Sequence, residues 1–105
     1  MSIASIVSDY PILGATAERL LSERYEVHRA TWAECEHMTI PTPDLVLLDV
    51  THVTGDRVLS LVSKLLPSVS VYITSLDRNE VDIYKISRHG LAHQGELPNL
   101  LAIRV

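Results

Sequence analysis

Residues 44–50, which read Asp-Leu-Val-Leu-Leu-Asp-Val, constrain the fold of this chain more than any other segment. The run is short, almost continuously apolar and bounded by Pro43 and Thr51, which is typical of a strand buried on both faces. In open α/β sheets, ligands and chemistry gather just outside the carboxyl ends of such strands. The segment therefore predicts a covered parallel sheet and places one carboxylate, Asp49, at an end where function is expected.

The rest of the chain alternates between strand and helix patterns. A period-2 alternation over residues 25–29 predicts a half-exposed strand. Thr31 and Glu34 form a capping box that opens a short helix. A fourth helix is expected to carry Val81, Tyr84 and Ile86 and to end at Gly90. In full, we expect strands at 3–7, 25–29, 44–50, 69–73 and 91–94, with helices at 11–21, 31–38, 58–65, 79–90 and 97–105.

This alternation predicts the fold class. Strands and helices in strict alternation imply a parallel sheet with right-handed crossovers. Five strands of this length fit the flavodoxin-like doubly wound order 2-1-3-4-5, with a shortened last strand and last helix. Residues 1–105 are expected to form one domain. In that order Asp9, Asp49 and Thr74 follow strands 1, 3 and 4 and meet at one crevice.

Composition narrows the classes of function. The net charge is −4, with acids and bases interspersed, which argues against nucleic-acid binding by this domain. The single cysteine, Cys35, excludes an internal disulfide. The N-terminus lacks the pattern of a signal peptide, and no run reaches the length of a membrane helix. We therefore expect a cytoplasmic protein with no membrane contact.

The crevice admits two interpretations. Two carboxylates held close together repel unless a hard cation such as Mg²⁺ lies between them, and a carboxylate in that setting can attack a phosphoryl group. Alternatively, Asp9 caps the first helix and Asp49 caps the loop after its strand. Spacing alone leaves both open.

At this point the chain resembles the receiver domains of bacterial two-component response regulators, above all those that precede a helix-turn-helix output domain. The likeness lies in the order of five segments, each of which matches a part of the receiver. By that resemblance Asp49 is the candidate phosphoacceptor and Thr74 the candidate switch hydroxyl. Asp9, Asp49 and the main-chain carbonyl of Thr51 are the candidate Mg²⁺ ligands. The five segments are residues 8–11, 44–49, 65–67, 71–75 and 99–104.

Several residues depart from the receiver pattern. Ser8 replaces the first acid of the pair, so Mg²⁺ should bind weakly, and the loop after Asp49 lacks the usual Met-Pro pair. Both lysines, Lys64 and Lys85, are expected on helices, so none is available to pair with a phosphoryl group. The interpretation is an atypical receiver, or pseudo-receiver, without enzymatic activity, in which phosphorylation of Asp49 is inefficient. The alternatives are a conventional Mg²⁺-dependent phospho-accepting switch and, with support from the fold alone, a small flavodoxin-like cofactor binder.

The same reading makes predictions about partners. Apolar residues near the C-terminus predict a homodimer or a docked output domain. A sensor histidine kinase is the partner that the resemblance implies for phosphorylation. His52 and His93 are expected to reach the Asp49 crevice and to make it sensitive to pH. The C-terminal apolar residues are Leu97, Leu100, Leu101 and Ile103.

Overall fold

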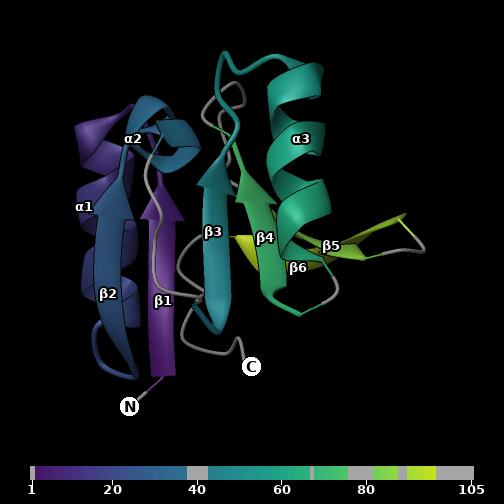
Figure 1. Cartoon of the computed structure of the whole chain (residues 1–105). Coiled ribbons are helices and arrows are strands. Elements are labelled where there is room, and N and C mark those ends of the chain that lie inside the picture. The colour runs from purple at the N-terminus through teal and green to yellow at the C-terminus, as the bar shows by residue number, and fades with distance from the viewer. Residues whose placement is uncertain (1, 38–42, 67, 76–81, 88–89, 97–105) are drawn as a thin grey trace.

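A computed structural model of the chain describes residues 2–37, 43–66, 68–75, 82–87 and 90–96. Nine elements are found among them, and Figure 1 shows the strands as one sheet with helices on both faces. In chain order they are β1 (Ser2–Val7), α1 (Pro11–Leu21), β2 (Tyr25–Ala30), α2 (Trp32–His37), β3 (Leu45–Asp49), α3 (Gly55–Leu65), β4 (Ser70–Thr74), β5 (Asp82–Ser87) and β6 (Gly90–Glu96).

The first four strands are parallel neighbours in the order β2-β1-β3-β4. All five residues of β3 are buried, as the apolar run predicts for a central strand. At the edge, β2 alternates between buried or half-buried and exposed positions over most of its length. Up to β4, the expected elements are present in the expected places.

The predicted fold class is wrong beyond β4. The sheet has six strands in the order β2-β1-β3-β4-β5-β6, and β4, β5 and β6 pair antiparallel. The expected fourth helix is instead β5. Ile83 packs into the core on one face, and Ile86 packs on the other, so the segment buries apolar groups on both sides of an extended strand. This chain therefore has a mixed sheet and not a five-stranded, all-parallel flavodoxin-like one.

Gly90, at which the sequence predicts the end of the fourth helix, is the first residue of β6. Its φ of 120° is a conformation that favours glycine, and Ser87 pairs with it across the hairpin. The predicted last strand, residues 91–94, falls within β6 but runs antiparallel to β5. The predicted helix at 97–105, including its apolar residues, lies outside the described residues.

Two apolar cores lie on the two faces of the sheet. The first lies between the sheet and α1 and contains Leu13, Ala17 and Leu21. The second lies under α2 and α3 and contains Trp32, Leu61 and Val62. Neighbouring residues of a strand point to opposite faces, so β3 contributes alternately to both cores. Within the described ranges, no helix has the length and apolar character needed to cross a bilayer.

The short helix α2 begins with the capping box that the sequence predicts. The Glu34 carboxylate accepts a hydrogen bond from the Thr31 backbone N–H at 3.0 Å, and Thr31 Oγ1 accepts one from the Glu34 N–H at 3.2 Å. The bond from the Thr31 N–H to the carboxylate, aided by the Thr31 side chain, favours the ionised carboxyl and lowers the pKa of Glu34. The box fixes the start of α2 and so places Trp32 over the end of β3.

Candidate functional site

Three polar side chains line up where β1, β3 and β4 end. Asp49 pairs with Thr74 in the sheet, and Ser8 directly follows β1. By strand alternation, all three point to the face that α1 covers. The structure thus brings together Asp49 and Thr74, as the sequence predicts, and adds Ser8 as a direct partner of the carboxylate.

The Asp49 carboxylate is buried, with only 2% of the residue exposed, and both of its oxygens are hydrogen-bonded. Ser8 Oγ donates to Oδ2 at 2.7 Å. The Thr51 N–H and hydroxyl donate to Oδ1 at 3.0 Å and 2.5 Å. A bond from the amide two residues ahead is the geometry of an Asx turn. Asp49 therefore caps the loop after β3, the structural role that spacing alone had left open.

The main chain of Asp49 is held as firmly as its side chain. The Trp32 indole N–H donates to the Asp49 carbonyl at 2.7 Å, and Trp32 is fully buried. Buried indole N–H groups usually find such a partner. This bond links α2 to the end of β3. No pattern in the sequence around Trp32 signals this hydrogen bond.

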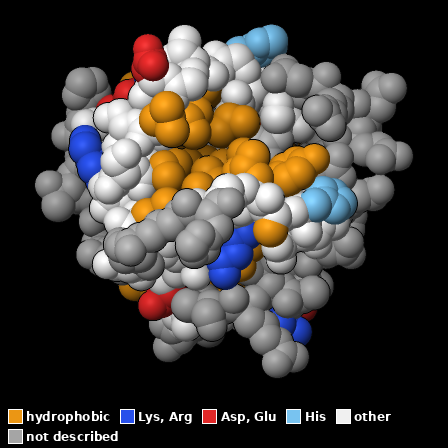
Figure 2. Space-filling view, turned by 90° about the vertical axis from the view of Figure 1, so that its right-hand side faces the viewer, with side chains coloured by type: hydrophobic (Ala, Val, Ile, Leu, Met, Phe, Trp, Pro, Cys, Tyr) orange, Lys and Arg blue, Asp and Glu red, His pale blue; other side chains and the backbone are white. Residues whose placement is uncertain are grey.

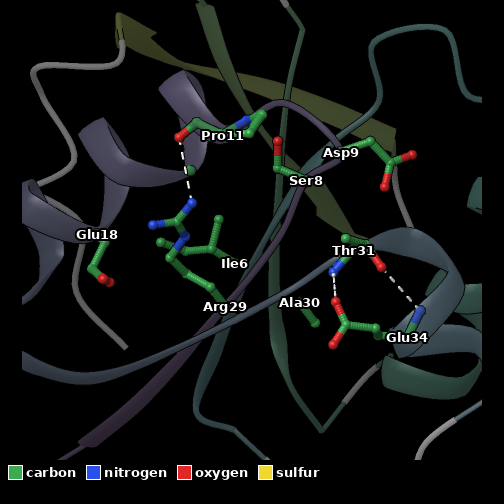
Figure 3. A pocket seen from close by; sticks show the side chains of 10 residues that line it. Ile6, Ser8, Asp9, Pro11, Glu18, Arg29, Ala30, Thr31 and Glu34 are labelled. Carbon is green, nitrogen blue, oxygen red and sulfur yellow. Dashed lines mark hydrogen bonds between the residues drawn. The ribbon is translucent and has the colours of Figure 1, made fainter.

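Asp9 lies close in sequence but has a different role. It is exposed, and its Oδ1 accepts the Trp32 backbone N–H at 3.0 Å, so it caps α2 and not the first helix. Beside it opens a pocket of about 440 Å³ between α1, β2 and α2 (Figure 3). On one wall of the pocket, the Arg29 guanidinium donates to the Pro11 carbonyl at 3.4 Å. A Cβ on Gly14 would come within 3.0 Å of that guanidinium, so glycine permits the close approach.

Thr74 differs from Ser8 and Asp49 in its hydrogen bonding. Its Oγ1 is buried without a hydrogen-bond partner among the described residues. Its neighbour on β5 is the buried, apolar Ile83. Lys85 lies on β5, not on a helix as expected, and its ammonium is 5.8 Å from the centre of the Tyr72 ring. Lys64 lies on α3, as expected. Among the described residues, the neighbour of Thr74 on β5 thus supplies an apolar contact.

The residues suggested as Mg²⁺ ligands have other bonding partners. Both oxygens of Asp49 accept bonds from neutral groups of the same chain, and Asp9 is bonded to α2. Thr51 is buried against Asp49. In the described ranges, no three His, Cys, Asp or Glu residues gather as a metal-binding group. This donor set fits Mg²⁺ poorly, and a magnesium site on Asp9, Asp49 and Thr51 stays a prediction.

The two histidines expected at the crevice lie in different places. His52 is exposed in the loop after β3, with a φ of 56° and its ring centre 6.3 Å from that of Tyr10. His93 is on β6, with its ring centre 5.2 Å from that of Tyr84. Tyr84 pairs with Ile73 in the sheet, and His93 pairs with Tyr84, so all three side chains point to the face that α3 covers. The Asp49 carboxylate points to the opposite face. His93 therefore does not reach Asp49, and the expectation for it is wrong.

No protein-family model, no curated protein and no solved structure matches this chain. The resemblance to receiver domains accordingly stays a prediction, and the site has to be interpreted from its own geometry.

Proposed function

We propose that this chain is a receiver-like module, a pseudo-receiver, that acts through protein contacts and does not depend on phosphorylation of Asp49. The observation that carries the proposal is the bonding of the Asp49 carboxylate, which is buried and accepts hydrogen bonds on both oxygens from Ser8 and Thr51. A nucleophilic oxygen needs access to its substrate and a free lone pair directed toward it. Here Oδ1 accepts two bonds from Thr51, Oδ2 accepts one from Ser8, and only 2% of the residue is exposed, so a phosphodonor has little access to either oxygen.

The surroundings of the carboxylate support the same conclusion. Developing charge on a transferred phosphoryl group is stabilised by cations or by charge-assisted hydrogen bonds. In the described part of the site, the donors are the neutral groups of Ser8 and Thr51, and Ile83 lies beside Thr74. Neutral donors suit a carboxylate with a structural role. The site then favours a docked output domain or a second copy of the chain as partner, and not a kinase.

One observation favours a second candidate, the conventional phospho-accepting switch. The Thr74 hydroxyl is buried, adjacent to Asp49 in the sheet, and without a partner among the described residues. Native proteins rarely leave such a group unsatisfied. In this alternative, an oxygen of a phosphoryl group on Asp49 would accept the Thr74 hydroxyl proton in a hydrogen bond.

The two candidates are separated by exposure to a small phosphodonor. We would incubate the protein with acetyl phosphate and Mg²⁺, and measure the intact mass alongside Asp49→Asn and a receiver domain of known competence. The proposal predicts no phosphoryl adduct on this chain under conditions that label the competent receiver. An adduct that forms on the wild type and disappears in Asp49→Asn would establish the conventional switch instead.

A further inference from the structure

An apolar groove runs beside α3, on the side of the β5–β6 hairpin, and the described residues do not fill it. Because β4, β5 and β6 are joined antiparallel, no helix among the described residues covers this part of the sheet beyond α3. Figure 2 shows hydrophobic side chains gathered across the centre of this side of the molecule. The groove has a volume of about 480 Å³. Residues that line it include Val53, Val58, Leu59, Ile73, Ile86 and Leu91.

The groove is unusual in both exposure and charge. Leu59 is 66% exposed and Leu91 is 61% exposed, although both are large apolar residues. None of the described residues that line the groove is charged. A contiguous apolar surface of this kind is typical of a protein-interaction site. Because it lacks charge, it cannot select an acidic or a basic partner, and it suffers no electrostatic repulsion when it meets a copy of itself.

The two edges of the sheet differ in their protection. The edge strand β2 carries Glu26, His28 and Arg29 at exposed positions, and such side chains discourage pairing with another strand. The other edge, β6, exposes Leu91, Ala92, His93 and Gln94, without a charged side chain in that stretch. Although the pairing of β5 with β6 shifts register between Ile83 and Tyr84, an edge stretch without charged side chains is a template for strand pairing. Gly90 and Leu91 belong both to this edge and to the groove, so the two form one continuous surface.

We propose that a second copy of this chain occupies this surface, with β6 pairing antiparallel to the partner's β6 about a two-fold axis. Antiparallel pairing of identical strands is self-complementary, so the same patch serves both subunits. With the two-fold axis perpendicular to the sheet, Leu91 and α3 of both subunits lie on the same side. The groove then contributes apolar area that the strand edges alone lack, toward the roughly 800 Å² per partner typical of stable interfaces. This inference rests on the proposed function, because it names the partner of the interaction module.

Sedimentation equilibrium over a range of concentrations tests the dimer without any phosphodonor. We would compare the wild type with Leu91→Lys and with Ile12→Lys, a matched control on α1 whose parent side chain is 83% exposed. The wild type is expected to dimerise, and Leu91→Lys to weaken the dimer at least about tenfold, which corresponds to 1.4 kcal/mol. Ile12→Lys should leave the dimer unchanged. Circular dichroism should show that both variants keep the fold, since neither parent side chain is buried.

Two results would overturn the proposal. One is a wild type that stays monomeric at every concentration, which would leave the groove to a different chain. The other is a dimer that Ile12→Lys weakens and Leu91→Lys does not. Hydrogen exchange gives a second readout, because the amides of β6, and not those of β2, should become more protected as the concentration rises. A monomer that resists phosphorylation would refute only the dimer, whereas a dimer that accepts phosphate would refute only the inert carboxylate.

Discussion

Replacing Asp49 by alanine should destabilise the fold, because this carboxylate holds the loop after β3 in place. The substitution removes three hydrogen bonds, donated by Ser8 Oγ and by the N–H and hydroxyl of Thr51. A hydrogen bond to a charged group contributes about 1.5–3 kcal/mol net, and a buried donor left without a partner costs about 1–3 kcal/mol. The substitution also removes the cost of burying a charged group, which is several kcal/mol before its hydrogen bonds are counted.

The geometry indicates how these terms combine. Ser8 can redirect its hydroxyl to the Tyr10 carbonyl, which already lies at 3.1 Å, so it is not stranded. The Thr51 hydroxyl has Ser75 Oγ at 3.5 Å, whereas the Thr51 N–H loses its bond to Asp49 Oδ1. We therefore expect Asp49→Ala to lower the free energy of unfolding by about 2–4 kcal/mol. Asp49→Asn keeps an acceptor for Thr51 and should lower it by only about 1 kcal/mol.

Urea unfolding followed by the fluorescence of Trp32, the only tryptophan, measures these changes. With an m-value of about 1.5 kcal/mol/M, a loss of 3 kcal/mol moves the midpoint down by about 2 M. Glu23→Ala, which removes an exposed acid between α1 and β2, is the control and should change stability by less than about 0.5 kcal/mol. Functional carboxylates are often a burden on stability. A neutral or stabilising effect of both Asp49 variants would therefore refute the structural role.

Four further predictions concern α2 and the residue that precedes it. Trp32→Phe removes the indole donor to the Asp49 carbonyl and should lower stability by about 1–3 kcal/mol, measured by circular dichroism in urea; an unchanged midpoint would argue against that bond. Thr31→Ala removes the side chain that caps α2 and should lower the free energy of unfolding by about 1 kcal/mol. The pKa of Glu34 is lower in the folded protein than in the unfolded chain, so the capping box stabilises the fold fully above the unfolded-state pKa of this carboxyl. This stabilisation is lost as the pH falls through the folded-state pKa. An NMR titration of Glu34 would follow that loss. Burial raises the pKa of the Cys35 thiol, so iodoacetamide at pH 8 should alkylate it more slowly in the folded protein than in urea, and equal rates would contradict the burial.

The sequence predicts the part of the fold in which local pattern and tertiary context agree. The apolar run before Asp49 is a central strand, and Thr31 with Glu34 is a capping box. After β4 the sequence predicts a helix that carries Val81, Tyr84 and Ile86 and ends at Gly90, whereas Tyr84 and Ile86 lie on β5 and Val81 is outside the described residues. Ile83 carried the contrary signal, since three β-favouring residues within β5 suit a strand that is buried on both faces. Short apolar segments leave helix and strand ambiguous, and the partner strand decides.

The candidate site could be predicted in position but not in bonding. Strand ends located Asp49 and Thr74, because the order of β1, β3 and β4 was correct. The roles of Ser8 and Trp32 depend on hydrogen bonds to Asp49. Ser8 is 41 positions away from it in the chain and Trp32 is 17 positions away, and no local sequence pattern encodes such contacts. One of the two interpretations of Asp9 has it cap the first helix, which is nearest in sequence, whereas its carboxylate caps α2.

The most direct test of the central claim is a titration of the protein with Mg²⁺ and then beryllofluoride, followed by the backbone amide shifts of Ser8, Thr51 and Thr74. An Asp49 carboxylate that is buried and bonded on both oxygens should give no saturable shift at millimolar Mg²⁺ and no new set of signals with beryllofluoride. Saturable shifts centred on these three amides, and lost in Asp49→Asn, would contradict the account and restore Asp49 as a phosphoacceptor.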